Sequence, residues 1–466
     1  MSKIPALASL KVAGFRGFGE EKKLNFAQPD GSPGSGLTIL VGPNNSGKST
    51  VAEAVMAATQ RQNKPPTFSE GKRNSVAEGR VKIELTDNEG RARVVETLAS
   101  GGSESVFSGD STTPSQSQVF VLPSRRKFEP YFGKSDTERT SYVNNSQNLP
   151  NTRAGQTDFS GRIFHINNDP ARRTAFEGIL GKVLDPLPVW TIDQTDQGNY
   201  YLKYSNKDHT HSSDGLGDGI LSVFFIVDAL YDSESGSTVF IDEPELSLHP
   251  QLQAKVLSLL VEFSQDRQII ISTHAPKFID WNAIVAGAKI ARVVNHEGQV
   301  GIYELSDDTR TRIKQLLADM NNPHVLGLDA NEVFFLSDGV LLVEGQEDVM
   351  YFPKVLNDLG LEIDAEFYGW GVGGATKMGT IAAILNDLGF SKVAGILDGN
   401  LSDHIPSLQE QFREYHFVSH PADDVRYKKD RPELTSLLDE KNKSVREEFR
   451  QETTTAITAV RQYFKK

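Results

Sequence analysis

The sequence predicts an α/β protein with two domains, each built on a parallel sheet. Apolar strand candidates run directly into a Gly-rich loop at 42–49 and into a pair of carboxylates, Asp242 and Glu243. The same pattern of apolar strands ending in acids starts again near residue 338 and reaches Asp398. Continuous apolar runs are typical of parallel strands, because both faces of a parallel sheet are buried. A length of 466 residues also fits two or three domains rather than one.

In the first domain, strand candidates occur at 10–15 and 37–41, separated by a turn-rich connection. Residues 50–60 are rich in Ala and other good helix formers, so the Gly-rich loop lies between a strand and a helix. From about 100 to 151 the chain is rich in Ser, Gly, Asn and Thr, which predicts a loop-rich insertion over about 100–200. Further buried strands are expected at 119–122, 237–241 and 268–271.

The second domain is expected after Asn321-Asn322-Pro323, because proline cannot continue the preceding helix. Its strand candidates, separated by helical stretches, are 340–343, 367–370, 393–397 and 415–418. The end of the chain is charged with spaced apolar residues, as in helices that dock on a core. We therefore expect domains at 1–330 and 331–430, followed by a helical tail at 431–466.

Composition excludes several classes of protein and of site. No run approaches the ~18 apolar residues of a membrane span, and residues 1–5 precede a strand-like stretch rather than a signal-peptide core. A cytoplasmic protein without membrane contact is expected. The absence of cysteine excludes disulfides and thiolate metal sites, so oxygen-bound Mg²⁺ is the natural metal and Mn²⁺ an alternative. The net charge of -13 argues against a whole-surface polyanion binder but permits a local basic patch.

The loop at 42–49 matches the pattern G-x-x-x-x-G-K-[ST], with an apolar strand before it and a helix after it. Its backbone N–H groups are expected to surround the phosphates of ATP, Lys48 to reach their outer oxygens, and the Ser49 hydroxyl to bind Mg²⁺. A chance Gly-rich turn is the alternative, which the strand, the lysine and the serine in their required places disfavour. The predicted ATP-binding residues of the loop are Gly42, Asn44, Asn45, Ser46, Gly47, Lys48, Ser49 and Thr50.

Asp242 and Glu243 end an apolar strand downstream of this loop. We expect Asp242 to bind the Mg²⁺ of ATP, directly or through water, and Glu243 to orient and deprotonate the attacking water. Such a strand is common by itself, and the upstream loop is what favours the catalytic interpretation. Ser213 and Gly215 precede a helical stretch and offer N–H groups and a hydroxyl to a phosphate. His274 follows the next strand.

With the runs Phe15 to Phe18 and Asp242 to Pro250, the first domain resembles the ABC-type ATPases of the SMC, RecF and OLD (overcoming lysogenisation defect) group. The resemblance implies that Ser213 and Gly215 belong to the signature segment, although the usual Leu-Ser-Gly-Gly form is absent. It also implies that His274 is the switch histidine that contacts the γ-phosphate; an ordinary strand-end histidine is the alternative. In this group the signature segment faces the loop of a second subunit, which implies a homodimer or higher oligomer through the ATPase heads.

Acids also end the strands of the second domain. Glu344 comes directly after one strand and Asp348 lies in the first turn of the following helix, so both can converge on one ion. Asp398 follows the strand at 393–397, and the C-terminal ends of parallel strands meet at one edge of a sheet. The sequence therefore predicts a Mg²⁺ site at this edge. Simple helix caps are the alternative for Asp348 and Asp398.

The order of these elements resembles a Toprim domain, the metal-dependent module of topoisomerases, primases and OLD-family nucleases. The resemblance implies that Glu344 is the first-strand glutamate and that Asp398 is the first acid of an Asp-x-Asp element. Asn400 occupies the position where an aspartate is usual. Its carbonyl oxygen can still bind a metal, but the lower charge weakens the site.

Cations and aromatics alternate at 124–134, a mixture that suits phosphate contact combined with base stacking. A loop near the nucleotide, with an arginine serving ATP or the dimer, is an equal alternative. The Gly-rich turn at 371–379 can also approach a phosphate. OLD-like nucleases carry another acid and a lysine after the last strand, for which Asp424 and Lys428 or Lys429 are candidates. The nucleic-acid candidates are Arg125, Arg126, Lys127, Lys377 and Lys428.

The expected fold is an ABC-type P-loop ATPase domain followed by a smaller Toprim-like parallel α/β domain. That is the arrangement of the OLD family, whose members include effectors of Gabija and certain retron defence systems. The resemblance implies an ATP-regulated, Mg²⁺-dependent DNA endonuclease in anti-phage defence. Its partners would be DNA and a defence-system subunit, such as a reverse transcriptase with its DNA product, a helicase or a nuclease.

The alternative, favoured by Asn400, is a non-cutting regulatory ATPase with a degenerate Toprim domain that controls a partner nuclease or toxin. A RecF- or SMC-like repair protein is disfavoured, because no long heptad arm interrupts the head.

Overall fold

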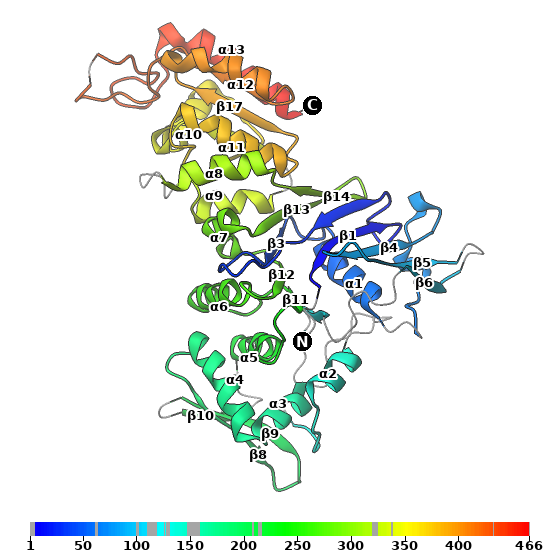
Figure 1. Cartoon of the computed structure of the whole chain (residues 1–466). Helices are drawn as coiled ribbons and strands as arrows, with labels where there is room; N and C mark the ends of the chain where they lie inside the picture. The colour runs from blue at the N-terminus through cyan, green and yellow to red at the C-terminus, as the bar shows by residue number, and fades with distance from the viewer. Residues whose placement is uncertain are drawn as a thin grey trace. The chain divides into compact units, whose positions relative to one another are not determined.

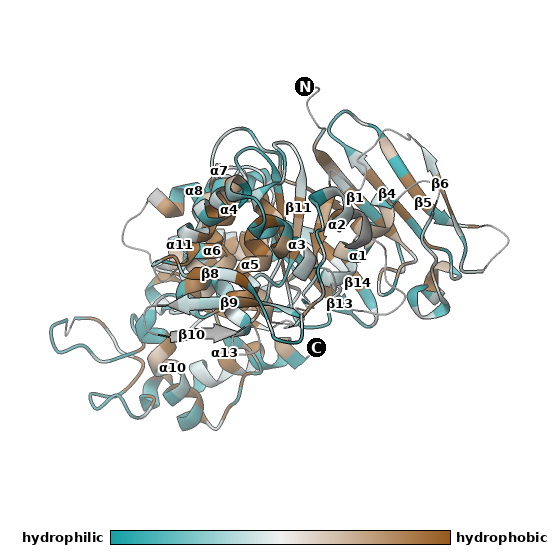
Figure 2. Ribbon diagram, turned by 90° about the horizontal axis from the view of Figure 1, so that it is seen from below, coloured by the Kyte–Doolittle hydropathy of each residue, from teal (hydrophilic) through white to brown (hydrophobic). Residues whose placement is uncertain are grey.

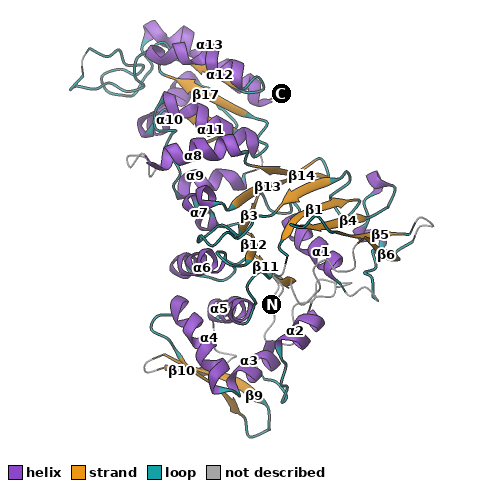
Figure 3. Cartoon of the chain, in the orientation of Figure 1, coloured by secondary structure: helices purple, strands orange, loops and turns teal. Residues whose placement is uncertain are grey.

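The computed structural model describes residues 5–60, 64–98, 102–109, 119–124, 126, 131–146, 159–206, 209–212, 217–318, 325–336, 339–431 and 433–465. The chain divides into two compact units, Met1–Ile302 and Tyr303–Lys466. Figures 1 and 3 show the helices and strands within each unit.

The core of the first unit is a six-stranded sheet. In spatial order its strands are β14 (Gln299–Glu304), β13 (Lys289–His296), β3 (Leu37–Val41), β12 (Gln268–Ser272), β11 (Thr238–Asp242) and β7 (Val119–Leu122). From β13 to β7 every neighbouring pair is parallel. Every residue of β3, β11 and β12 is buried, as expected for central parallel strands. The C-terminal ends of these strands share one edge, where the predicted ATP-binding loops begin.

Helix α1 (Lys48–Thr59) lies between this sheet and a second, antiparallel sheet. In spatial order the strands of the second sheet are β2 (Lys22–Asn25), β1 (Leu7–Ala13), β4 (Lys82–Asp87), β5 (Ala92–Thr97) and β6 (Ser105–Gly109). One buried cluster contains Val55 of α1, Leu10 of β1 and Phe240 of β11. The helix that starts in the Gly-rich loop is therefore held by apolar contacts on two sides.

Three further helices complete the predicted ATPase region: α5 (Asp218–Tyr231), α6 (Pro250–Phe263) and α7 (Trp281–Ala286). Helix α5 contacts β7 and β11 and is buried continuously from Ser222 to Leu230. Figure 2 shows the hydrophobic character of α5. A helix that is apolar around most of its circumference is typical of a position inside a large unit.

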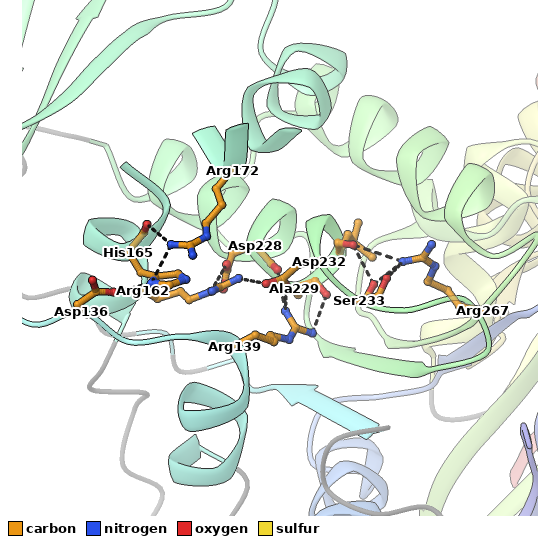
Figure 4. Close-up of polar contacts among 11 residues, drawn as sticks. Asp136, Arg139, Arg162, His165, Arg172, Asp228, Ala229, Asp232, Ser233 and Arg267 are labelled. Atoms are coloured by element: carbon orange, nitrogen blue, oxygen red, sulfur yellow. Dashed lines mark hydrogen bonds and ion pairs between the residues drawn. The ribbon is translucent and has the colours of Figure 1, made fainter. Parts of the chain in front are cut away.

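The predicted loop-rich insertion holds more regular structure than expected. Besides β6 and β7, its described elements are α2 (Arg139–Ser146), α3 (Phe159–Asn167), α4 (Pro170–Val183) and β8 (Val189–Gln194). Strand β8 forms an antiparallel sheet with β9 (Tyr200–Asn206) and β10 (His209–Ser212), which extend beyond the predicted bounds. Figure 4 shows that buried Arg162 of α3 donates from Nε to Asp228 of α5 at 2.8 Å and also pairs with Asp232. Composition does not reveal this contact, because Arg162 and Asp228 are 66 residues apart in the sequence.

The second unit is built on a four-stranded parallel sheet. In spatial order its strands are β16 (Glu366–Phe367), β15 (Val340–Val343), β17 (Val393–Leu397) and β18 (His416–Ser419). Its helices are α8 (Asp307–Ala318), α9 (Leu328–Glu332), α10 (Gln346–Leu359), α11 (Ala375–Asp387), α12 (Ile405–Gln411) and α13 (Glu447–Lys465). The strand expected at 367–370 ends early, at Phe367. Gly369 and Gly371, with positive φ of 47° and 91°, turn the chain away from the sheet.

In the sequence, the division between the two units falls between Ile302 and Tyr303, within β14, and α8 packs on α11 in the second unit. The predicted helical tail contains one helix, α13, whose Ile457, Val460 and Phe464 lie in the same buried cluster as the strands β15 and β17. No described helix has the length and apolar character needed to cross a bilayer.

Candidate nucleotide and metal sites

The Gly-rich loop has the backbone that its glycines predict. Gly42 has a φ of 137°, and a Cβ there would lie 2.1 Å from the carbonyl oxygen of Val293. Only glycine fits this position without moving the neighbouring strand. Gly47, the residue before α1, also has a positive φ, of 108°. The loop therefore turns tightly from β3 into α1 and presents the helix N-terminus to an anion.

Lys48 is the buried cation of this loop. Its Nζ donates to the carbonyl oxygens of Gly42 at 2.8 Å and Pro43 at 2.9 Å, and lies 3.5 Å from His274 Nδ1. Burial lowers the pKa of Lys48 to about 8, although Asp242 and neighbouring acids oppose the shift. An incoming phosphate would compete with the two carbonyl oxygens for this ammonium.

Asp242 connects the loop to the end of β11. Its Oδ1 accepts from Ser49 Oγ at 3.3 Å and also from Ser272 Oγ of β12. The predicted Mg²⁺ ligands Ser49 and Asp242 are therefore adjacent, which is the arrangement that binding of Mg²⁺-ATP requires.

Glu243 and His274 face each other across the ends of β11 and β12. His274 Nε2 lies 3.8 Å from Glu243 Oε1, and both side chains are about one-third exposed (30% and 29%). Burial, followed by the positive charge of Lys48, lowers the pKa of His274 to about 4, so the imidazole is neutral at pH 7. Glu245 fixes the His274 segment, since its carboxylate accepts from the His274 N–H at 2.5 Å and from Thr273 Oγ1 at 2.9 Å.

Lys48, Ser49, Glu243 and His274 line a cavity of about 330 Å³. Arg16, Asn295 and Val300 line it in addition to the predicted residues Asn44 to Thr50, Glu243 and His274. Arg16 is held in place by two hydrogen bonds to the Glu53 carboxylate, of 2.8 and 3.0 Å. The structure thus brings together the predicted residues of the loop, β11 and β12 around one polar cavity.

Of the stretch 124–134 the structure describes residues 124, 126 and 131–134, so Arg126 is the one described residue among the nucleic-acid candidates of this stretch. Its guanidinium donates to the carbonyl oxygens of Asp242 and Glu243 rather than facing open solvent. The geometry therefore matches the alternative interpretation, a loop near the nucleotide. Arg125, Lys127, Ser213 and Gly215 lie outside the described residues.

The predicted acids of the second unit gather at the C-terminal edge of its sheet. Glu344 Oε1 accepts from the Asp398 N–H at 2.9 Å, which joins the ends of β15 and β17. Asp348 accepts from the Gly345 N–H at 2.9 Å and so caps its own helix, as the alternative for this residue predicted. Burial, reinforced by the charge of Asp398, raises the pKa of both Glu344 and Asp348 to about 7.

His420 is the partner of Asp398, with His420 Nε2 2.8 Å from Asp398 Oδ1. Burial, reinforced by Asp424, raises the pKa of Asp398 to about 7. Burial lowers that of His420 to about 4. From the sequence, His420 could be recognised only as the residue that follows β18. No sequence pattern predicted its contact with Asp398.

The donor set of this edge suits a hard divalent cation. Its carboxylates supply only oxygen, are partly or fully buried and raise one another's pKa, a cost that a cation would relieve. Among the described residues, however, no three acidic or histidine side chains are already arranged as a metal cage. His420 contacts Oδ1 of Asp398 and the Gly345 N–H contacts Oδ2 of Asp348, so each carboxylate keeps a second oxygen that could bind an ion.

Three further predicted residues belong to this unit: Asn400 and Lys377 are exposed or partly exposed, and Lys428 forms ion pairs. Asn400 is exposed on the turn Gly399–His404, and Lys377 is partly exposed in the first turn of α11. Lys428 Nζ lies 2.6 Å from Glu347 Oε2 and also pairs with Asp424. The lysine is therefore part of an acid-rich cluster next to Asp398.

Sequence reasoning missed Glu245, Glu53 and His420, and it did not foresee the contacts of Arg126. Glu245 lies within the Asp242 to Pro250 run, so the motif marked its neighbourhood but not its role. For Glu53 the sequence shows only that it follows the Gly-rich loop, and for His420 only that it follows β18. Neither position by itself predicts the contact that the residue makes.

Comparison with known proteins identifies both units. The family described as "AAA domain, putative AbiEii toxin, Type IV TA system" matches residues 37–280. The family described as "Overcoming lysogenization defect protein-like, TOPRIM domain" matches residues 335–399.

Among curated relatives, the OLD nuclease of Thermus scotoductus is 35% identical over 176 residues, which cover 35% of this chain and 32% of the relative. Endonuclease GajA of Bacillus cereus is 24% identical over 156 residues, covering 33% of this chain and 25% of the relative. The chain thus spans a third or less of the length of these two proteins. Septu protein PtuA of Bacillus thuringiensis is 23% identical over 344 residues, covering 64% of this chain and 78% of the relative.

Among solved structures, an SmcHead bound to the C-winged helix domain of ScpA aligns with 65% of this chain and 99% of its own, at 14% identity and a TM-score of 0.43. The match of the first family to residues 37–280 covers more than half of the chain. The chain therefore belongs to this AAA-domain family and carries an OLD-like TOPRIM domain after its ATPase domain.

Proposed function

We propose that the chain is an ATP-regulated, Mg²⁺-dependent DNA endonuclease that acts in anti-phage defence in the cytoplasm. The proposal rests on one observation: a cavity lined by Lys48, Glu243 and His274 occurs in the same chain as the partly buried acids Glu344 and Asp398 of a TOPRIM domain. The relatives named OLD nuclease and endonuclease GajA support it.

In the ATPase domain, the loop N–H groups and Lys48 would hold the phosphates, with Ser49 and Asp242 as the ligands of Mg²⁺. Glu243 would orient the attacking water and accept its proton. Neutral His274, 3.8 Å from Glu243, can donate its N–H to the γ-phosphate without competing for the proton. Binding or hydrolysis of ATP would then gate the second site.

In the TOPRIM domain, Glu344, Asp348 and Asp398 are the residues that would hold Mg²⁺, with Mn²⁺ as a substitute. A bound ion supplies charge neutralisation at a phosphodiester and a more acidic water. Glu344 ties the ends of β15 and β17 together through the Asp398 N–H, so the two acids stay at the same edge of the sheet. His420 orients Asp398 from the opposite side.

The resemblance to ABC-type heads and to the named relatives supports a proposal about oligomeric state and partners. We propose a homodimer or higher oligomer formed through the ATPase domains, with DNA as substrate. A defence-system partner, such as a reverse transcriptase with its DNA product, would supply the trigger.

A plasmid-nicking assay tests the proposal. The full chain is incubated with supercoiled DNA and Mg²⁺ or Mn²⁺, with and without ATP. Asp398→Ala should reduce cleavage by about 100-fold or more, because it removes a metal ligand and the partner of His420. Asp403→Ala, an exposed acid in the turn that follows Asp398, is the matched control and should cut like the wild type. Lys48→Ala should abolish the response to ATP.

Asn400 favours one other function, a regulatory ATPase that does not cut and instead controls a partner nuclease or toxin. Its exposed amide replaces the usual second acid of the metal site. Absence of cleavage by the wild type under every metal and nucleotide condition would contradict the nuclease proposal. Cleavage that appears only in Asn400→Asp would show that this position decides between the two functions.

A further inference from the structure

Arg126 binds the main chain of the segment that carries both acids of the nucleotide site. Its Nη2 donates to the carbonyl oxygens of Asp242 at 2.8 Å and Glu243 at 3.0 Å. Its Nη1 donates to Ser222 Oγ at 2.5 Å, and its Nε to the carbonyl oxygen of Pro123 at 3.2 Å. One guanidinium thus joins the end of β7, the first part of α5 and the end of β11.

The backbone that Arg126 holds is an uncommon one. Glu243 has a φ of 50°, in the left-handed region, which costs a residue with a side chain on the order of 1 kcal/mol. Its N–H donates to the carbonyl oxygen of Ser272 at 2.8 Å, and its own carbonyl also accepts from the Leu246 N–H at 3.2 Å. Because φ sets the direction of the Cα–Cβ bond, these contacts fix the direction in which the Glu243 side chain leaves the backbone.

Arginine has the chemistry that this position requires. The two carbonyls that Nη2 contacts lie on either side of the Glu243 backbone dihedrals, so the contact fixes both ends of the turn. A planar guanidinium holds several acceptors in fixed directions, which a lysine ammonium on a flexible stem does not. Its charge also lies within range of the carboxylates of Asp242, Glu243 and Glu245, whose mutual repulsion it offsets.

We propose that Arg126 is a positioning residue for ATP hydrolysis, which holds the Asp242–Glu243 turn so that the Glu243 carboxylate faces the attacking water. Arg126 acts through Glu243 and not on the substrate. The inference rests on the proposed ATPase activity of this site.

Steady-state and single-turnover ATP hydrolysis by the full chain tests the role. Arg126→Ala should lower kcat by about 10- to 100-fold and change KM by less than about threefold, because the phosphate-binding loop is left intact. Arg126→Lys should fall between the wild type and Arg126→Ala, since one ammonium replaces only part of the hydrogen bonding.

A double-mutant cycle with Glu243→Gln separates positioning from general weakening of the fold. If Arg126 works by aiming the Glu243 carboxylate, its substitution costs kcat only while that carboxylate is present. The double variant Arg126→Ala with Glu243→Gln should therefore hydrolyse ATP within about twofold of Glu243→Gln alone. If Arg126→Ala does not fold, Arg126→Lys takes its place in the same cycle.

Arg139→Ala is the matched control. Arg139 also donates to main-chain carbonyls of α5, those of Asp228 at 2.9 Å and Ala229 at 3.3 Å, and it pairs with Asp232 (Figure 4). This variant loses comparable hydrogen bonds at the other end of the helix, so it should keep the wild-type kcat.

Three outcomes overturn the inference while leaving the ATPase proposal standing. They are an unchanged kcat in both Arg126 variants, an equal fold-loss with and without Glu243→Gln, and a loss in Arg139→Ala as large as in Arg126→Ala. A folded wild-type chain that does not hydrolyse ATP would instead contradict the proposed ATPase function itself.

Discussion

His274 lies between the ammonium of Lys48 and the carboxylate of Glu243, and burial decides its charge. Its pKa falls to about 4, first because it is desolvated and second because Lys48 is close. The residue type and its place after a strand were available from the sequence. The lowered pKa was not, since it depends first on burial and then on Lys48, which is 226 residues away in the sequence.

The lowered pKa of His274 predicts a dependence of stability on pH. The unfolded histidine takes up a proton near its ordinary pKa of 6.5, whereas the folded one does so only near 4. The contribution to stability is therefore complete above pH 6.5 and is lost as the pH falls toward 4. Between pH 7.5 and 5, the wild type should lose on the order of 1 kcal/mol more than His274→Gln, since partial exposure reduces the effect.

Thermal melting of both proteins across this pH range measures the difference. His296→Gln, a substitution of an exposed histidine at the end of β13, should follow the wild type. Parallel melting curves for the wild type and His274→Gln would contradict the lowered pKa.

At the scale of secondary-structure elements, continuous apolar runs gave reliable predictions. The strands expected at 37–41, 119–122 and 393–397 are β3, β7 and β17 with the predicted bounds. The insertion was different, because its helices are held by contacts such as Arg162 with Asp228 that leave no local periodic signal. Composition predicted loops in this region, whereas the structure has helices and a sheet that long-range contacts stabilise.

Helix α13 is predicted to be part of the core of the second unit rather than a dispensable tail. Ile457 is 1% exposed and lies in one buried cluster with Leu341 and Ala394 of the sheet. Ile457→Ala should lower the free energy of unfolding of this unit by about 2 to 4 kcal/mol, through lost burial and the cavity left behind.

Chemical denaturation of the full chain, followed by a probe in the second unit, measures this change. Gln462→Ala on the exposed face of the same helix should stay within about 0.5 kcal/mol of the wild type. An equally small effect of Ile457→Ala would mean that α13 does not contribute to the core.

At the scale of the whole molecule, the two units carry two different chemistries. The first gathers Lys48, Ser49, Glu243 and His274 around one polar cavity, and the second gathers partly buried acids at the edge of a parallel sheet. Each site lies where the C-terminal ends of parallel strands meet, which is where such sheets place their ligands. Ser213 and Gly215, the residues predicted for the signature segment, lie outside the described part of the chain, and association through the ATPase heads stays a prediction.

That association is predicted to depend on ATP. Glu243→Gln should bind ATP without hydrolysing it and thereby accumulate the form in which nucleotide lies between two heads. With Mg²⁺-ATP this variant should double its mass from the 51.3 kDa of one chain, as measured by light scattering or mass photometry. Lys48→Ala should show no change on addition of ATP. Masses that are the same for both variants, with and without nucleotide, would contradict an ATP sandwich.

The sequence by itself determined the Gly-rich loop at 42–49, the acids at the ends of β11, β15 and β17, and the family. These features are encoded in short runs whose residue types and spacing the chemistry requires. The tertiary structure alone decided that Arg126 holds the Glu243 turn, that His420 is the partner of Asp398 and that His274 is neutral. Those properties depend on groups that are distant in the sequence and on burial, for which a local pattern has no signal.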